Sequence, residues 1–336
     1  MDGSIHRLTA AVLGETRARS ILGALDFAPL PDREEETVAV VDRAAFAIAL
    51  NAILFAGLLD RVPTGARYVA SVVARGAKVR FDHGALRMID GPTGGLPGGH
   101  GAFARLLEPL GYRVGGVYPL PRLRMTGRAY AHADFPETVP QFFVSELHVG
   151  ELSQEAQGAV ERIFGQSVDP LDDDARAMLD AFAKEGRCAF ALARAGLPSL
   201  VRAFGRQHGV PHLRDYEMLR ADSAEGAWMA TEGNAFNHAT DRVDDVAALA
   251  DALREEGYPI KPDVEISTNG RVRQTAFLAD KVRRDFVLDD GSVAQREVPG
   301  SFYEFISRDI DPDTGRLDLS FDSGNATGIF SMTRAS

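Results

Sequence analysis

The stretch AKVRFDHGALRMI, residues 77–89, has the apolar and β-branched character of a β-strand and carries a histidine at its centre. It is followed by the glycine-rich loop GPTGGLPGGH, the helical pattern GAFARLLEPLGY and further strand patterns. A second stretch, GNAFNHATDRV at residues 233–243, also places a histidine on a predicted strand. A predicted helix follows it, and then a predicted hairpin around Asn269-Gly270. The two regions therefore share one order of elements.

The spacing within the two regions supports an internal repeat. His83 precedes Gly111, at the end of the predicted helix, and His238 precedes Gly257 at the corresponding place. The first interval is longer than the second by nine positions, which is the length of PTGGLPGGH, a segment without a counterpart in the second region. We therefore predict two strand–helix–strand–strand–strand units, each of which begins with a histidine-bearing strand. Such paired βαβββ units resemble the cupped mixed sheet of the glyoxalase-like (vicinal oxygen chelate) superfamily.

The predicted fold class is α+β, with helices added to the two units. Residues 1–75 form a helical N-terminal segment, and residues 76–150 form the first βαβββ unit. Residues 151–228 return to helical patterns and form an insertion. Residues 229–336 form the second unit, which carries His238 and Glu304.

Composition and charge narrow the function classes. The 336-residue chain has a net charge of −11, so we expect neither a nucleic acid nor a membrane surface as partner. The single cysteine, Cys188, excludes an internal disulfide framework and a cysteine-based zinc site, and it fits a reducing compartment. The longest apolar stretch, residues 44–59, is shorter than the roughly 20 residues of a membrane span and predicts a buried helix. No signal-peptide pattern is present, so we expect a cytoplasmic protein.

The last predicted strand of the second unit, SFYEFISRD, carries a carboxylate among apolar residues. Side chains alternate along a strand, so Phe302 and Glu304 share one face, with Tyr303 and Phe305 on the other. An ionised carboxylate is costly to bury without a partner, and a metal ion is one natural partner. Together with the two repeat histidines, Glu304 would complete a two-histidine, one-carboxylate triad. Non-haem Fe(II) oxygenases use this ligand set, which leaves coordination positions open.

Several motifs also carry a family resemblance. DHGALR, PQFFVSELH, AFNHATDRV, LADKV and VPGSFYEFISR occur in this order in the 2-oxoadipate dioxygenase/decarboxylase (hydroxyglutarate synthase) family. The chain resembles the shorter branch of this family over about residues 75–335. The resemblance implies Fe(II) as cofactor, with His83, His238 and Glu304 as its ligands, and Arg87 as the group that holds a substrate carboxylate. It also implies conversion of 2-oxoadipate and O₂ to 2-hydroxyglutarate and CO₂.

Arg87 and Glu146 are the remaining candidate site residues. Arg87 lies four residues after His83 and shares its face of the strand, so its guanidinium could grip a substrate carboxylate with two hydrogen bonds. The alternative for Arg87 is a surface ion pair. The interval from His83 to Glu146 is close to that from His238 to Glu304, which predicts that Glu146 is the repeat counterpart of Glu304. Glu146 would be either a fourth metal ligand, as in glyoxalase-type isomerases, or a hydrogen-bond acceptor that orients a ligand histidine.

Three function classes follow from this pattern. The first is an Fe(II)-dependent dioxygenase/decarboxylase whose partners are a small 2-oxo acid and O₂. The second is a glyoxalase-type metal-dependent isomerase or lyase, which would favour a fourth ligand such as Glu146. The third is a metal-free small-molecule-binding protein on the same fold. Consumption of O₂ on addition of a 2-oxo acid separates the first class from the others, and the sequence leaves the oligomeric state open.

Overall fold

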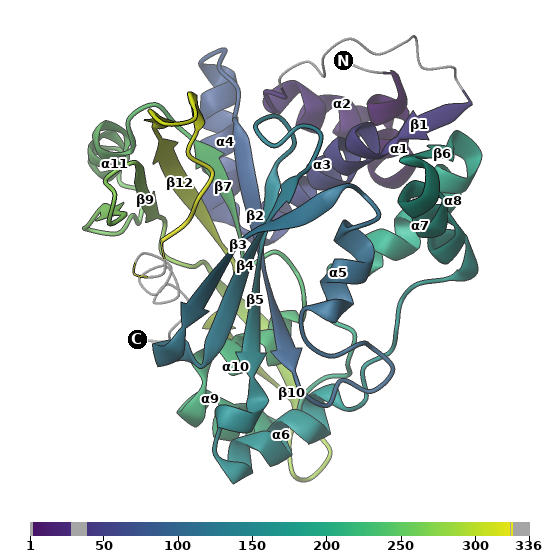
Figure 1. The fold of residues 1–336 in the computed structure, drawn as a ribbon. Helices are drawn as coiled ribbons and strands as arrows, with labels where there is room; N and C mark the ends of the chain where they lie inside the picture. Colours follow the sequence, from purple (N-terminus) through teal and green to yellow (C-terminus); the bar gives the residue numbers. More distant parts are fainter. Residues whose placement is uncertain (1–2, 28–38, 323, 325–336) are drawn as a thin grey trace.

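The computed structural model describes residues 3–27, 39–322 and 324 (Figure 1). Its centre is an eight-stranded sheet with the strand order β3-β4-β5-β2-β7-β12-β9-β8, which curls as a half-barrel (Figure 1). The strands of one half are β2 (Phe81–Asp90), β3 (Tyr112–Leu120), β4 (Met125–His132) and β5 (Gln141–His148). Those of the other half are β7 (His238–Arg242), β8 (Glu265–Ile266), β9 (Val272–Ala276) and β12 (Phe302–Arg308).

Each half of the sheet is one βαβββ unit. The first unit runs β2, α5 (Gly101–Leu107), β3, β4 and β5, and the second runs β7, α11 (Val246–Glu255), β8, β9 and β12. The first strand of each unit pairs in parallel with the last, and β2 pairs antiparallel with β7 to join the two units. The predicted α+β fold of paired βαβββ units is therefore confirmed.

The register across the β2–β7 seam makes the two histidines equivalent. His83 lies opposite Thr240, and His238 lies opposite Ala85, so each histidine faces the residue two places after the other. The connections that follow differ in length, because ten residues separate β2 from α5 and three separate β7 from α11. The glycine-rich stretch that has no counterpart in the second unit lies in the longer connection.

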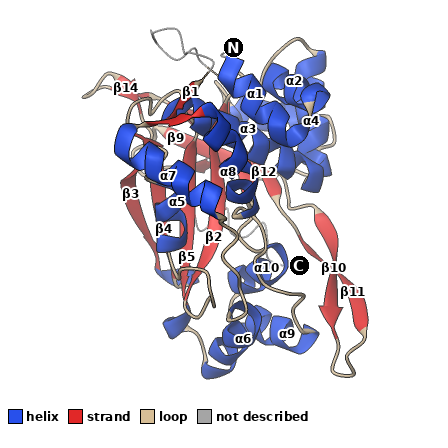
Figure 2. Cartoon of the chain, turned by 90° about the vertical axis from the view of Figure 1, so that its right-hand side faces the viewer, coloured by secondary structure: helices blue, strands red, loops and turns tan. Residues whose placement is uncertain are grey.

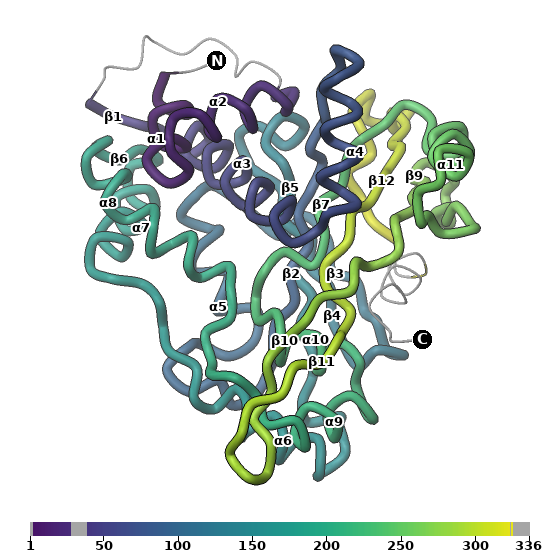
Figure 3. Tube along the Cα trace, turned by 180° about the vertical axis from the view of Figure 1, so that it is seen from behind, coloured from purple at the N-terminus to yellow at the C-terminus, as the bar shows by residue number. Residues whose placement is uncertain are grey.

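The second unit contains a hairpin that the first unit lacks. The strands β10 (Lys281–Val287) and β11 (Val293–Pro299) form a separate two-stranded sheet and lie between β9 and β12 in the chain. The sequence DKVRRDFVL, residues 280–288, forms β10, which is not part of the central sheet. The five residues before Phe286 are exposed or half-buried, and four of them are charged, so this strand could not fill a buried central position. Figure 3 shows this hairpin extending toward α6 and α9, where Phe286 packs against Tyr216.

Helices from the N-terminal segment and the insertion cover the sheet (Figure 2). The N-terminal helices are α1 (Gly3–Leu13), α2 (Glu15–Ala24), α3 (Arg43–Arg61) and α4 (Pro63–Ala74). The insertion contributes α6 (Gln154–Phe164), α7 (Asp173–Glu185), α8 (Phe190–Arg202), α9 (Leu213–Asp222) and α10 (Ala224–Glu232). Short elements complete the fold: β1 (Val40–Asp42), β6 (Arg187–Ala189), η1 (Pro121–Leu123), η2 (Val149–Glu151), β13 (Ile310–Asp311) and β14 (Arg316–Leu317).

The helix α3 is the central helix of this cover. Asp42 caps its start, because the Asp42 carboxylate accepts hydrogen bonds from the backbone N–H groups of Ala44 and Ala45. By length and composition α3 could cross a membrane, but 78% of its most apolar 18-residue stretch is buried inside the fold. This burial is what a core helix shows, as the sequence predicted.

The two faces of the sheet have different roles. Leu86, Phe142 and Tyr303 belong to the large core under the helices. The adjacent residues on the same strands point to the other face, since side chains alternate. That inner face carries small apolar clusters around Phe143 and Phe302, and between them lie the polar groups of the site.

Candidate metal centre

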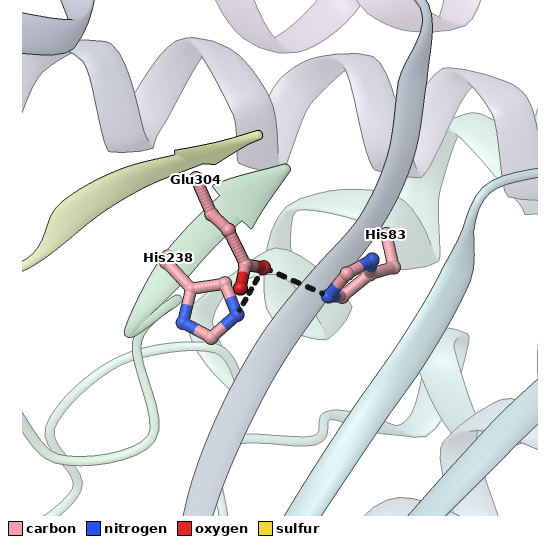
Figure 4. A group of neighbouring side chains, drawn as sticks. All are labelled: His83, His238 and Glu304. Carbon is pink, nitrogen blue, oxygen red and sulfur yellow. Dashed lines mark ion pairs between the residues drawn. The ribbon is translucent and has the colours of Figure 1, made fainter. Parts of the chain in front are cut away.

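The structure brings the three predicted ligands together on the inner face of the sheet. Nε2 of His83 lies 3.3 Å from Oε2 of Glu304, and Nε2 of His238 lies 3.2 Å from the same oxygen (Figure 4). One potential ligand atom from each residue lies within 4.8 Å of the others, and all three residues are buried. The donor set of two imidazole nitrogens and one carboxylate oxygen, converging from three strands, fits a divalent transition metal.

Each histidine is held through its Nδ1 atom by the residue that precedes it. Oδ1 of Asp82 lies 2.8 Å from Nδ1 of His83, and Oδ1 of Asn237 lies 3.1 Å from Nδ1 of His238. Carboxylate and amide oxygens only accept hydrogen bonds, so both Nδ1 atoms donate. Each Nε2 is then the atom that would bind a metal ion, and the hydrogen bond at Nδ1 fixes the orientation of the ring.

Thr240 fixes the carboxylate between the two rings. It lies on β7 opposite both His83 on β2 and Glu304 on β12. Its hydroxyl donates to Oε2 of Glu304 at 2.5 Å and lies 3.1 Å from Nε2 of His83. The seam between the two units therefore sets the orientation of the carboxylate as well as the positions of the histidines.

The electrostatics of the triad favour a cation. Burial would raise the pKa of Glu304, but His238 and His83 outweigh burial and hold this pKa well below its usual range. Burial lowers the pKa of His238, so this ring is a neutral imidazole, as metal ligation requires. Burial would also lower the pKa of His83, but Asp82 and Glu304 outweigh it and raise this pKa. The two carboxylates that favour a proton on His83 would also favour a metal ion beside it.

An open pocket, with about 440 Å³ of empty space including solvent at its mouth, lies at the triad. Besides the three ligands it is lined by Ala85, Leu86, Arg87, Phe143, Ser145, Asn237, Gln274, Phe321 and Asp322. Eight of the twelve lining residues are polar or charged, and Ala85, Leu86, Phe143 and Phe321 supply the apolar part of the wall. This combination of apolar surface and converging polar groups is usual for small-molecule sites. A ligand in this pocket would contact both the metal site and Arg87.

Arg87 is fixed inside the protein and does not form a surface ion pair. It is 1% exposed, and Nη1 lies 3.5 Å from Oε2 of the equally buried Glu225. Its guanidinium lies 5.0 Å from the centre of the Trp228 ring, and its backbone carbonyl accepts from Nδ2 of Asn234. Burial lowers the pKa of Arg87 to about 10, so the group stays charged at neutral pH. The alternative of a surface ion pair is therefore wrong, and Arg87 lies beside the metal centre.

The structure does not place Glu146 at the triad. Its carboxylate pairs with Arg128 at 2.5 Å and accepts from the backbone N–H of His100 at 2.7 Å. Ser145 lines the pocket, so the next side chain along β5 points to the other face. Glu146 therefore contacts neither a ligand histidine nor the pocket, and burial, which would raise its pKa, is outweighed by His100 and Arg128, which lower it.

The repeat counterpart of Glu304 is Phe143, which corrects the equivalence inferred from spacing. Gln141 lies opposite His83 on β5, and Phe302 lies opposite His238 on β12. Two residues further along each strand are Phe143 and Glu304. The position where a symmetric site would supply a fourth ligand is thus a phenylalanine that lines the pocket.

Sequence reasoning missed the residues that support the ligands. Asp82, Asn237 and Thr240 hold the triad in place, and Phe321 closes one side of the pocket. A signal for the first two was present, because DHGALR and NHATDR share an acid or amide before the histidine and an arginine four residues after it. Phe321 lies beyond the last strand of the central sheet, where no motif marks it.

Comparison with known proteins agrees with this geometry. The sequence profile of the 2-oxoadipate dioxygenase/decarboxylase family matches residues 66–316. The chain is 24% identical over 306 residues to the chloroplastic/amyloplastic 2-oxoadipate dioxygenase/decarboxylase of Oryza sativa, and covers 75% of that protein. It is 23% identical over 215 residues to the chloroplastic protein of the same name from Arabidopsis thaliana. That match spans 58% of this chain and about half (51%) of the Arabidopsis protein.

Solved structures show the same fold. A protein from Ralstonia eutropha JMP134 that is assigned to the glyoxalase superfamily is 51% identical, with a TM-score of 0.91, and the match covers 96% of this chain and 99% of that one. The hydroxyglutarate synthase of Oryza sativa, crystallised with 2-oxoadipate, is 20% identical with a TM-score of 0.68, over 92% and 98% of the two chains. Because the profile match covers most of the sequence and the ligand triad is assembled, the chain belongs to the 2-oxoadipate dioxygenase/decarboxylase family.

Proposed function

We propose that this protein is an Fe(II)-dependent dioxygenase/decarboxylase of a 2-oxo dicarboxylic acid, with 2-oxoadipate as the leading substrate. The observation that carries the proposal is the buried triad of His83, His238 and Glu304 at a pocket that also contains Arg87. The family match and the 2-oxoadipate bound in the rice enzyme support the choice of substrate.

The proposed reaction is balanced without a further reductant. 2-Oxoadipate and O₂ contain together the atoms of 2-hydroxyglutarate and CO₂, so the substrate itself supplies the electrons that reduce O₂. His83, His238 and Glu304 would hold Fe(II), which would supply the positions that the 2-oxo acid chelates and the redox chemistry that activates O₂. With three protein ligands, coordination positions stay open for the substrate and for O₂.

The residues of this chain would orient and shield the reactants. His83 and His238 are fixed by Asp82 and Asn237, so the ligand atoms need little rearrangement when the metal binds. Arg87 would bind the distal carboxylate of the substrate through its planar guanidinium. The apolar wall that contains Phe143 and Phe321 would exclude water from the reacting end.

Phe143 also argues against the glyoxalase-type alternative. An isomerase that relies on a fourth protein ligand would need a donor atom at the repeat counterpart of Glu304, and a phenyl ring offers none. Glu146 cannot supply it, because its carboxylate lies on the other face with Arg128 and His100. A metal-free binding protein is also disfavoured, since it has no use for a buried carboxylate between two imidazoles.

Oxygen consumption tests the proposal directly. The protein should be freed of metal, reconstituted with Fe(II) without oxygen, and mixed with aerated 2-oxoadipate in an oxygen electrode. We expect O₂ uptake with equal amounts of CO₂ and 2-hydroxyglutarate, and none with the His238→Ala variant. Isomer formation without O₂ uptake, or binding of 2-oxoadipate without turnover under Fe(II), would refute the proposed function.

A further inference from the structure

Arg308, on the last strand of the second unit, holds the acid that orients a metal ligand. Its side chain is fully buried, and Nε and Nη2 donate to the carboxylate of Asp82 at 2.9 to 3.1 Å. The same carboxylate accepts from Nδ1 of His83 at 2.8 Å. The guanidinium is therefore one hydrogen-bonded residue away from the ligand histidine.

The remaining donor of Arg308 holds a different part of the chain. Nη1 donates to the backbone carbonyls of Asp318 and Ser320 at 2.9 and 2.7 Å. The guanidinium carbon also lies 4.8 Å from the centre of the Phe321 ring. We call residues 318–322, which follow the last strand of the central sheet, the roof segment.

The roof segment covers the metal centre. The ring of Phe321 lies 4.9 Å from the ring of His83 and 4.8 Å from that of Phe143, measured between centroids. Phe321 and Asp322 both line the pocket. The segment is also tied at its far end, since Asp322 accepts from the backbone N–H and the hydroxyl of Thr268.

We propose that Arg308 is a positioning residue that couples the orientation of His83 to the closure of the roof segment over the metal. Through Asp82 it would set the affinity of the site for the ion. Through Asp318 and Ser320 it would hold Phe321 over His83 and so limit access of solvent and of competing ligands. This inference rests on the proposed metal site and extends it to a residue that touches neither metal nor substrate.

The chemistry of the side chain supports this double role. A guanidinium offers five donors in a rigid plane, so it can bind a carboxylate on one edge and backbone carbonyls on another. A lysine ammonium could keep the charge beside Asp82 but could not reach both sets of acceptors in the same geometry. Arg308→Lys and Arg308→Met therefore separate the two parts of the proposal.

The test uses Co(II) as a spectroscopic probe in the full-length protein and needs no turnover. Two quantities are measured: the equilibrium affinity for Co(II), and the rate at which excess EDTA removes bound Co(II). For Arg308→Met we expect affinity weaker by about 10- to 100-fold, as for other losses of outer-sphere support, together with faster removal. For Phe321→Ala we expect removal faster by about 10-fold or more, with affinity within about threefold of the parent, because the ligands stay oriented.

Arg242 provides the matched control. Its Nη1 lies 3.9 Å from Oδ2 of Asp82, but its side chain is 25% exposed and, among the residues that the structure describes, forms no hydrogen bond or ion pair with the roof segment. Arg242→Met should leave affinity and removal rate within about twofold of the parent. Arg271→Met, which removes one of the hydrogen bonds to the side chain of Asp318 and leaves Asp82 untouched, should accelerate removal without a loss of affinity.

The outcomes are distinguishable. If Arg308→Met does not fold, as judged by thermal melting, Arg308→Lys decides, with faster removal expected at near-parental affinity. If Arg308→Met or Arg308→Lys matches Arg242→Met in both quantities, the proposed coupling is wrong. If Phe321→Ala releases Co(II) at the parental rate, the roof segment does not control access. Failure of the parent protein to bind Co(II) would instead refute the metal site, and with it the proposed function.

Discussion

In the first unit Phe143 lies two residues beyond the partner of the ligand histidine, and in the second unit Glu304 holds the same place. The histidines themselves, His83 and His238, are equivalent across the β2–β7 seam. The symmetry of the scaffold thus supplies two equivalent histidines as candidate metal ligands. The difference between Phe143 and Glu304 means that the site offers three candidate ligands and not four. That difference gives a site with a ligand on one side and an apolar pocket wall on the other.

The units differ at two further positions counted from their histidines. The arginine four residues on is Arg87 in the first unit, 1% exposed and lining the pocket, and Arg242 in the second, whose side chain is 25% exposed. The residue three places on is Leu86 in the first unit and the buried acid Asp241 in the second. The repeated scaffold therefore differs between its halves in an arginine that lines the pocket only in the first unit and in a buried acid, Asp241, only in the second.

The largest effect on metal affinity is expected at Glu304, the candidate ligand without a counterpart in the first unit. Glu304→Gln keeps the size of the side chain but removes its charge, so metal affinity should fall by more than about 100-fold, beyond the loss typical of outer-sphere partners. Glu146→Gln should keep metal affinity within about twofold, since this carboxylate pairs with Arg128 on the other face. Metal content after dialysis, measured by elemental analysis, compares the two. Equal losses would restore Glu146 as the functional counterpart.

The next largest effect is expected on kcat/KM, where substitution of Arg87 and of Arg242 should have different consequences. Arg87→Met removes a charge-assisted contact to the substrate carboxylate, so kcat/KM for 2-oxoadipate should fall by about 10- to 100-fold with metal content retained. Arg242→Met should change kcat/KM by less than about twofold. Steady-state O₂ uptake with each variant gives both values. An Arg87→Met variant as active as the parent would remove the substrate assignment while leaving the metal site intact.

A carboxylate in place of Phe143 should change metal affinity less than the loss of Glu304 does, and in the opposite direction. Phe143→Glu places a carboxylate at the counterpart of Glu304, where it could fill an open coordination position. We expect metal affinity to rise by about 10-fold and O₂ uptake to fall by about 10-fold or less, because a position needed by substrate or O₂ is taken. A titration with Co(II) and an oxygen electrode measure the two changes. A variant with unchanged affinity would show that Phe143 is not aimed at the metal.

The buried acid should affect stability rather than activity. Burial raises the pKa of Asp241 from 3.8 to about 7, although it accepts from the Tyr68 hydroxyl at 2.8 Å. Because the pKa of Asp241 is higher in the folded than in the unfolded protein, its protonation contributes to the free energy of unfolding. This contribution is complete below the unfolded pKa and is lost as pH rises through about 7. As pH rises from about 4 to 8, the parent should therefore lose free energy of unfolding relative to Asp241→Asn, by on the order of 2 to 4 kcal/mol. Urea unfolding of both proteins across this range provides the test, and parallel pH profiles would contradict it.

The sequence was sufficient to predict the parts of the site that depend on strand periodicity. Phe302 and Glu304 do share a face, and Arg87 does lie in the same pocket as His83. Both predictions follow from the alternation of side chains along a single strand, which needs no knowledge of the partner strand. The repeat itself was visible because each unit begins with the same histidine-bearing strand.

Register between strands could not be predicted by counting residues. The two histidine-to-glutamate intervals, His83 to Glu146 and His238 to Glu304, are close in length only because the two units carry insertions in different places. The first unit has the longer connection after β2, and the second has the hairpin β10–β11 before β12. Glu146 thus matched Glu304 in spacing but not in register. Roles that come from tertiary contacts, such as that of Phe321, leave no local pattern and were missed for that reason.

The seam between β2 and β7 has a consequence for how the protein folds. It pairs residues that are far apart in the chain, such as His83 with Thr240, so it closes only after two long stretches have found each other. The triad straddles this seam and is therefore incomplete in any state in which only one unit is ordered. A metal bound at the proposed site would link the two halves, and would add about 2.7 kcal/mol to the free energy of unfolding at a free concentration of about 100 times Kd. If the proposed metal site is correct, the supply of the ion would therefore set the stability of the fold as well as the activity.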